Sequence, residues 1–108
     1  MARRYITVDH DTGPLAIGDY LLSAKEIGEE TEDGEREILL VITDTRIKGP
    51  ERSKARYLAT GEAVEIDREL SVRFFVGGNG QTRGMIEAPA QWLLRRVKLR
   101  PANLGQAE

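Results

Sequence analysis

The alternation of apolar and polar residues along the chain predicts a series of short β-strands. In these segments long or β-branched side chains recur at every second position, so one face of each strand would be buried. Clusters of Gly, Pro, Asn and Asp, which are typical of turns, separate the segments. The predicted strands span residues 4–8, 20–27, 36–45, 62–66, 71–76 and 85–88.

The segment 36–45 differs from the other predicted strands because its centre, residues 38–42 (ILLVI), is apolar without interruption. Such a run predicts a strand in the middle of a sheet or barrel, covered on both faces. The polar stretch before it contains Asp33-Gly34, a dipeptide that favours tight hairpin turns. Residues 27–38 are therefore predicted to form a long hairpin with an acidic tip.

A short helix is predicted near the C-terminus, at about residues 89–98. Pro89 suits its first turn, and Pro101 lies just beyond its end. Residues 50–60 leave two alternatives open, a helix that begins at Pro50 or a loop that leads into a strand. The apolar residues with the spacing of one face of the C-terminal helix are Ala90, Leu93, Leu94 and Val97.

Together these elements predict a mainly β fold. We expect a small single-domain antiparallel barrel or sandwich with one short helix near the C-terminus. A length of 108 residues suits one domain and is too short for two ordinary ones. The domain is expected to span residues 1–100, followed by a loose tail at residues 101–108.

The composition indicates a compact core under a heavily charged surface, with 40% hydrophobic and 31% charged residues. A net charge of -2 excludes a protein that is a polycation throughout, although it allows a local basic patch. The absence of cysteine excludes disulfides, thiolate zinc sites and cysteine nucleophiles, and it fits a reducing compartment. No apolar run approaches the about 20 residues of a membrane-spanning helix. The N-terminal stretch also lacks the apolar segment of a secretory signal. We therefore expect a soluble, cytoplasmic protein without a membrane partner.

Residues 8–14 (VDHDTGP) contain the Asp-Thr-Gly triplet that carries the catalytic carboxylate in aspartic proteases. In those enzymes an apolar strand precedes the triplet and keeps the paired carboxylates dry. Here Asp9 and His10 precede Asp11, so two further ionisable groups would bring water and additional charge next to the carboxylate. Pro14 follows the glycine, where a small residue is usual in that family. We therefore interpret this segment as a turn.

No metal, cofactor or phosphate site is predicted. The chain has one histidine, His10, which would point away from Asp9 and Asp11 if the segment were extended. The acidic residues 29–33 lack the spacing of a calcium loop. The glycine-rich residues 77–84 lack the lysine and the following helix of a phosphate-binding loop, so they are interpreted as a flexible hairpin loop. The protein is predicted not to be an enzyme, and no catalytic residue, cofactor or small-molecule substrate is assigned.

Charged residues are segregated along the chain. Residues 26–37 contain seven acidic side chains, residues 46–56 contain five basic ones, and residues 95–100 contain four more basic ones. Three interpretations stay open. The basic segments form a docking face for nucleic acid, acidic and basic regions guide association with a protein or a second copy, or the charges are simply solvated.

The aromatic residues favour an interaction surface. Phe74 and Phe75 are adjacent, so on a strand they point to opposite faces. One of them belongs to the core, and the other must be covered by the helix, by another subunit or by a ligand. Trp92 either extends the buried face of the predicted helix or anchors an interface. Tyr57 follows Arg56 and is a candidate for stacking on a nucleic-acid base.

The sequence therefore predicts a non-enzymatic protein–protein interaction or assembly module, a subunit of a larger complex or a homo-oligomer. The alternative is a small β-barrel that binds nucleic acid through the basic segment 46–56. The candidate interaction residues are Phe74, Phe75, Trp92, Arg46, Lys48, Arg52, Lys54, Arg56, Tyr57, Arg95 and Arg96.

Overall fold

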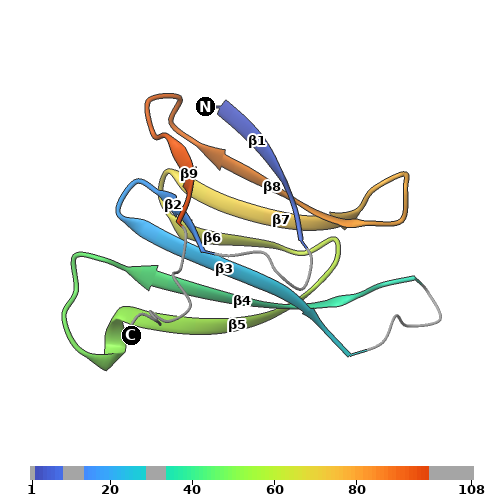
Figure 1. Cartoon of the computed structure of the whole chain (residues 1–108), viewed down its shortest axis with the longest axis horizontal. Coiled ribbons are helices and arrows are strands. Elements are labelled where there is room, and N and C mark those ends of the chain that lie inside the picture. Colours follow the sequence, from blue (N-terminus) through green and yellow to red (C-terminus); the bar gives the residue numbers. More distant parts are fainter. Residues whose placement is uncertain (1, 9–13, 29–33, 98–108) are drawn as a thin grey trace, which may run out of the picture.

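A computed structural model describes residues 2–8, 14–28 and 34–97, which form two antiparallel β-sheets around one core (Figure 1). The four-stranded sheet has the strand order β1-β8-β7-β6, and the five-stranded sheet has the order β5-β4-β3-β2-β9. The elements are β1 (Ala2–Thr7), β2 (Leu15–Ile17), β3 (Tyr20–Ile27), β4 (Glu37–Asp44), η1 (Pro50–Arg52), β5 (Ser53–Ala59), β6 (Ala63–Asp67), β7 (Leu70–Val76), β8 (Thr82–Ala88) and β9 (Leu94–Arg96).

Alternation along the strands separates the core from the surface. In β7, Val72 and Phe74 are 2% and 0% exposed, whereas Arg73 and Phe75 lie on the opposite, outer face. Both sheets contribute side chains to a single hydrophobic cluster, so the fold is one compact domain. Its largest fully buried apolar residues are Ile17, Ile38, Leu40, Leu70, Val72, Phe74 and Ile86.

A glycine makes room for the largest of these side chains. Gly84 in β8 lies directly opposite Phe74 in β7. A Cβ atom on Gly84 would lie 3.1 Å from Phe74 Cε1 and 3.1 Å from Ile6 Cγ1. The missing side chain therefore lets the Phe74 ring lie against the backbone of β8.

The predicted mainly β, antiparallel fold is confirmed, and all six predicted strands are present within a few residues of their expected bounds. The segment 50–60, left open by the sequence, forms the short 3-10 turn η1 followed by β5. The three-residue strand β2 was not predicted, because three residues are too few to show an alternating pattern.

The alternative of a closed barrel is wrong. The outermost strands of one sheet, β1 and β6, form no ladder with β5 or β9 of the other sheet in the part of the chain that the structure describes. The prediction for β4 is partly confirmed, because it lies inside its sheet between β3 and β5. Only one face is fully buried, however. Ile38 and Leu40 are in the core, whereas Leu39 and Val41 are half-buried on the outer face.

The helix predicted at about residues 89–98 is wrong. A turn follows Pro89, whose carbonyl accepts a hydrogen bond from the Trp92 N–H (3.0 Å), and β9 comes next. An isolated helix of about ten residues is marginal in water. The edge of β2 instead supplies backbone partners for β9, and Leu94 packs against the core.

The β3–β4 hairpin that the sequence predicted is present, with Ile27 opposite Glu37 at its described end. Its predicted acidic tip at residues 29–33 lies outside the described residues, as do the predicted turn containing Asp11-Thr12-Gly13 and the predicted tail at residues 101–108. Among the described segments, no helix is both long and apolar enough to cross a membrane.

Candidate functional site

The structure separates the two adjacent phenylalanines. Phe74 fills the core at 0% exposure, so it offers no surface to a partner. Phe75 lies on the outer face of the four-stranded sheet, where its ring meets the ring of Tyr5 edge to face. The ring centroids are 6.2 Å apart and the interplanar angle is 88°. Tyr5 is 52% exposed, so this aromatic pair is open to solvent.

Arg83 in β8 completes the cluster. Its guanidinium carbon lies 5.7 Å from the centroid of the Tyr5 ring, within the range of a cation–π contact. Its Nε is buried and has no hydrogen-bond partner among the described residues. The strand register brings the cluster together, because Arg83 is paired with Thr7 of β1 on one side and with Phe75 of β7 on the other.

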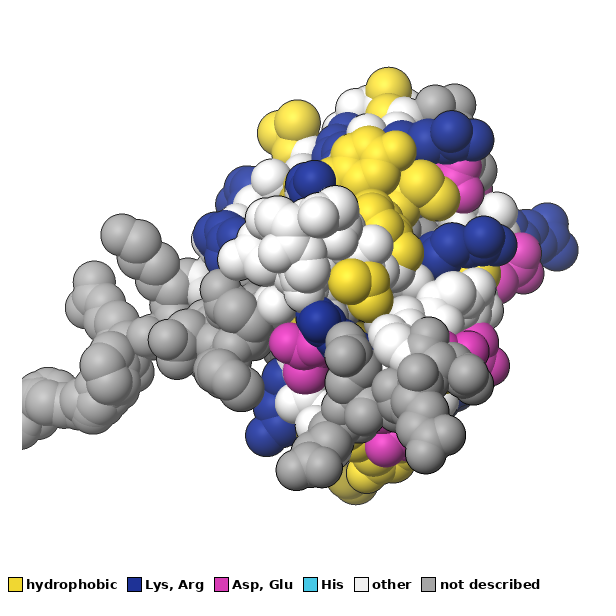
Figure 2. Space-filling model, turned by 90° about the vertical axis from the view of Figure 1, so that its right-hand side faces the viewer, with side chains coloured by type: hydrophobic (Ala, Val, Ile, Leu, Met, Phe, Trp, Pro, Cys, Tyr) yellow, Lys and Arg dark blue, Asp and Glu magenta, His cyan; other side chains and the backbone are white. Residues whose placement is uncertain are grey.

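A shallow hollow of about 240 Å³ lies on the same outer face. Arg3 and Glu87, which line it, form an ion pair of 3.1 Å. Arg73 and Met85, which are paired across β7 and β8, also line it. In its upper half, Figure 2 shows a run of hydrophobic side chains with Lys or Arg side chains on both sides. We call the surface made by Tyr5, Phe75, Arg73, Arg83 and Met85 the aromatic face.

A second concave site, a cleft of about 260 Å³, lies between β5 and β6. These strands are consecutive in the chain but belong to different sheets. They meet at a corner where Gly61, at φ +97, donates its N–H to the Phe74 carbonyl (2.7 Å), and they separate from there (Figure 1). The cleft is lined by the basic residues Arg52, Lys54 and Arg56 and by the apolar residues Ile42, Val64 and Ile66.

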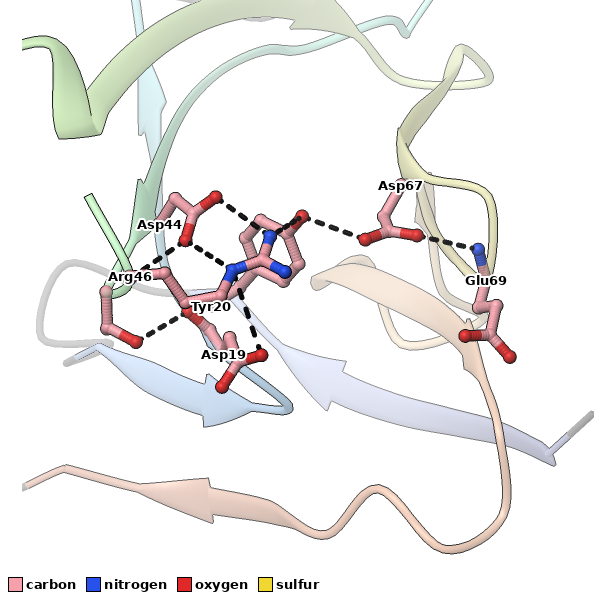
Figure 3. Close-up of polar contacts among 7 residues, drawn as sticks. Asp19, Tyr20, Asp44, Arg46, Asp67 and Glu69 are labelled. Carbon is pink, nitrogen blue, oxygen red and sulfur yellow. Dashed lines mark hydrogen bonds and ion pairs between the residues drawn. The ribbon is translucent and has the colours of Figure 1, made fainter.

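A polar network ties the two sheets together at the end of this cleft (Figure 3). The Tyr20 hydroxyl of β3 donates to Asp67 Oδ2 at the end of β6 (2.9 Å). Arg46 donates from Nη2 to the Tyr20 oxygen (3.0 Å), and its guanidinium lies 5.4 Å from the centroid of that ring. Arg46 also binds both carboxylate oxygens of Asp44, at 3.0 and 2.9 Å.

The network shifts the pKa values of its members. Burial of the phenol raises the pKa of Tyr20, and the hydrogen bond to Asp67 raises it further. The same hydrogen bond lowers the pKa of Asp67, and the hydrogen bonds from Arg46 lower the pKa of Asp44. The hydrogen bonds with Asp44 in turn raise the pKa of Arg46. At neutral pH these groups therefore hold one arrangement, with a neutral phenol between ionised partners.

A second polar cluster connects the sheets at the other end of β3. The Thr82 hydroxyl of β8, which is 1% exposed, donates to Glu26 Oε2 (2.7 Å) and accepts from Arg36 Nη1 (2.9 Å). Arg36 also approaches Glu26 at 3.4 Å. The buried Thr82 hydroxyl thus has both a donor and an acceptor as partners, and the cluster links the base of the β3–β4 hairpin to the four-stranded sheet.

The structure brings together only part of the basic segment 46–56. Arg52, Lys54 and Arg56 line the cleft, whereas Arg46 is held by Asp44 and Lys48 is exposed in the connection between β4 and η1. The side chains of Lys54 and Arg56 make no hydrogen bond or ion pair with another described residue. Tyr57 is 63% exposed, but adjacent strand residues point to opposite faces. Arg56 and Tyr57 therefore do not form one stacking site.

The remaining candidate residues lie elsewhere. Arg95 and Arg96 are exposed on β9, at the opposite edge of the five-stranded sheet from β5, so these two arginines do not adjoin the basic residues of β5. Trp92 is partly buried against the core and lies over Gly18. A Cβ atom on Gly18 would lie 2.7 Å from Trp92 Cε3, so the glycine makes this packing possible.

The sequence did not indicate Tyr5, Arg73, Arg83 or Met85 as members of a site. The alternation of β1 and β8 does show which of their residues share a face. The missing information is the strand order β1-β8-β7, which alone places Tyr5 and Arg83 beside Phe75. The cleft could not be predicted for a similar reason, because the sequence does not show that the chain passes from one sheet to the other at Gly61.

The described residues contain no group of three or more His, Cys, Asp or Glu side chains arranged to hold a metal ion. Comparisons with protein-family models, with curated proteins and with solved structures found no match to this chain. The described residues form two candidate binding sites, the aromatic face and the cleft between β5 and β6.

Proposed function

We propose that the protein is a protein–protein interaction module and that the aromatic face is its principal binding surface. The observation that carries the proposal is the solvent-exposed Tyr5–Phe75 pair beneath Arg83. Burial of exposed aromatic side chains by a partner stabilises the complex. Here the four-stranded sheet holds them in a fixed arrangement before any partner arrives, which lowers the entropic cost of association.

The residue types of this face support the proposal. Tyr, Phe, Met and Arg are enriched at the centres of protein interfaces, and Tyr and Arg are frequent among the residues that dominate binding energy. The face also contains a hollow that a side chain of a partner can enter. The Arg3–Glu87 ion pair, which lines the hollow, supplies polar groups of the kind that surround such a centre.

Replacing Tyr5 by alanine tests the proposal. We expect Tyr5→Ala to weaken partner binding at least tenfold, or about 1.4 kcal/mol, because it removes the most exposed member of the pair. Light scattering of the purified protein would measure self-association. Affinity capture from an extract of the native source, followed by calorimetric titration of each captured protein, would measure binding to other partners.

Leu93→Ala is the control, because it removes a large apolar side chain, 70% exposed, that lies outside this face. It should leave the affinity unchanged. Two results together would contradict the proposal. The protein would stay monomeric at every concentration tested, and its wild-type and Tyr5→Ala forms would capture the same proteins with the same affinity.

Single-stranded nucleic acid is a second candidate partner, and one observation favours it on this same face. Arg3, Arg73 and Arg83 lie on the outer face beside the rings of Tyr5 and Phe75. Single-strand binders combine basic and aromatic side chains in this way, so that bases stack while cations contact phosphates. The basic cleft residues offer no such combination, because the exposed Tyr57 points away from them.

Titration of a labelled mixed-sequence oligonucleotide at about 50 and about 200 mM salt, followed by fluorescence anisotropy, tests this second candidate. Phosphate contacts predict binding that weakens by orders of magnitude at the higher salt. Arg73→Glu should weaken it further, whereas Arg68→Glu, in an exposed turn, should not. If Lys54→Glu were the damaging change, the basic segment 46–56 would be the binding surface, and absence of binding at low salt would reject both surfaces.

A further inference from the structure

We propose that the free edge of β5, together with the cleft between β5 and β6, binds an extended acidic segment of a partner protein as an added β-strand. This binding mode is independent of the aromatic face, because the linings of the two sites share no residue. It depends on three features of the described residues: a side of β5 without a neighbouring strand, the direction of its basic side chains, and the apolar residues of β6.

One side of β5 has no neighbouring strand in the part of the chain that the structure describes. β5 is the outermost strand of its sheet and pairs only with β4. The Ala59 N–H donates to Glu62 Oε1 (2.6 Å) and the Ala59 carbonyl accepts from the Glu62 N–H (3.1 Å), so both groups point away from β4. Since backbone groups two residues apart point the same way, those of Ser53, Ala55 and Tyr57 also face the free side.

The basic side chains of β5 point toward the cleft. Lys54 and Arg56 lie opposite Ile42 and Leu40 of β4, whose side chains face the core. Lys54 and Arg56 therefore share the inner face of the sheet, but they lie beyond the cover of the four-stranded sheet and stay exposed. An added strand beside β5 would place every second side chain next to these two cations.

The β6 wall of the cleft contains two apolar residues, Val64 and Ile66, on either side of Glu65. Val64 of β6 is 4% exposed, and Ile66 is partly buried against the core. A strand inserted between β5 and β6 would thus contact cations along one side and aliphatic side chains along the other. Main-chain hydrogen bonds would supply affinity, and the positions of alternate side chains would supply specificity.

The charge of the edge selects an acidic occupant. Inward-pointing charges on an edge strand oppose pairing with another such edge. Two β5 strands placed side by side would bring Lys54 and Arg56 near their counterparts, so a second copy is disfavoured at this edge. The acidic residues that also line the cleft are Asp44, Glu51 and Glu65. Asp44 is already bound by Arg46, Glu51 lies in η1 before β5 begins, and Glu65 alternates with the inward-facing Val64. A segment with carboxylates at every second position would neutralise the cations that otherwise keep strands away.

An acetylated and amidated seven-residue peptide that alternates valine with glutamate is a suitable probe. NMR titration to about 1 mM should shift the resonances of Ser53, Ala55 and Tyr57. The same peptide with lysine in place of glutamate should not bind. A third peptide, N-methylated at those amides that would donate to β5, should bind at least tenfold more weakly because it cannot complete the ladder.

Two protein variants complete the test. Ala55→Pro removes an N–H that faces the free side, and proline is tolerated at such edge positions, so the protein should stay folded while the glutamate peptide binds at least tenfold more weakly. Lys54→Glu should weaken the glutamate peptide similarly and favour the lysine peptide, with Arg68→Glu as the control. Circular dichroism melting would confirm that each variant is folded, and the N-methylated peptide tests the ladder without altering the protein.

Several results would overturn the inference. One is equal binding of the methylated and unmethylated peptides, and another is equal binding of the acidic and basic ones. A third is self-association, without peptide, that Ala55→Pro abolishes, which would identify a second copy as the occupant. Oligonucleotide binding that Lys54→Glu abolishes, with no peptide binding, would identify nucleic acid instead. None of these outcomes depends on Tyr5, so failure here and failure of the aromatic face are distinguishable.

Discussion

At the scale of single residues, two glycines decide where the largest rings lie. Gly84 leaves the space that the Phe74 ring occupies, and Gly18 leaves the space for Trp92. In both places an added Cβ atom would lie 3.1 Å or less from an aromatic carbon. Gly18 also has a φ of +58, a conformation that residues with a side chain rarely adopt. Both glycines therefore have steric roles that the spacing of residues in the sequence does not show.

Replacing Gly84 by valine should lower the free energy of unfolding by about 1–3 kcal/mol, because Phe74 is completely buried and its ring has little room to move. Urea denaturation monitored by circular dichroism would measure the change. Gly78→Val is the control, since a Cβ atom at Gly78 meets nothing within 4 Å. Equal stability of the two variants would show that the core around Phe74 adapts to the larger side chain.

At the scale of elements, a strand or helix was predicted correctly when the pattern that determines it lies within one segment, and not when it depends on contacts between segments. The strands at residues 20–27 and 71–76 were predictable because alternation is a local pattern. The segment 89–98 was misread because the helical spacing of Leu93, Leu94 and Val97 is also local, whereas the decisive contact, the edge of β2, is not. Leu93 is 70% exposed in the structure, so the apparent apolar stripe does not form one buried face.

The residues of the candidate sites were also predictable only where the information is local. Phe75 and the basic residues 52–56 could be identified from the sequence because their chemistry is visible in the residue types. Their partners could not be identified, because Tyr5 and Arg83 join Phe75 only through the order of three strands. The bare edge of β5 also depends on strand order, since any strand can be central or outermost until its neighbours are known.

At the scale of the whole molecule, the two sheets are joined by apolar packing and by a polar cluster at each end of β3. At one end Tyr20 binds Asp67, and at the other end Thr82 and Arg36 bind Glu26. Apolar packing has little directional preference, whereas hydrogen bonds do. The two clusters therefore fix the position of one sheet on the other, and the Tyr20–Asp67 bond also limits how far the cleft between β5 and β6 can open.

The Tyr20–Asp67 bond should make stability depend on pH at both extremes. The folded pKa of Asp67 is lowered, so unfolded chains bind more protons, and stability should fall as the pH drops below about 3.8, the ordinary aspartate value. The folded pKa of Tyr20 is raised, so stability should also fall as the pH rises above 10.0. Thermal melting across the pH range would measure both losses.

Tyr20→Phe separates this bond from the rest of the protein. The variant lacks the phenol, so the alkaline loss that it contributes should disappear. The acid loss should become smaller, because Asp67 no longer accepts the hydrogen bond that lowers its pKa most. The bond between Tyr20 and Asp67 would have no part in either loss if the variant had the same pH profile as the wild type.

The separation of the aromatic face from the β5 edge has a consequence for stoichiometry. Because the two sites share no side chain, occupation of one leaves the residues of the other free. A protein with two such sites can be bivalent. If both ligands belonged to one flexible partner, binding at the first site would raise the effective concentration at the second, so two weak contacts would give strong overall attachment. If the ligands belonged to different proteins, this small domain would join them and hold them next to each other.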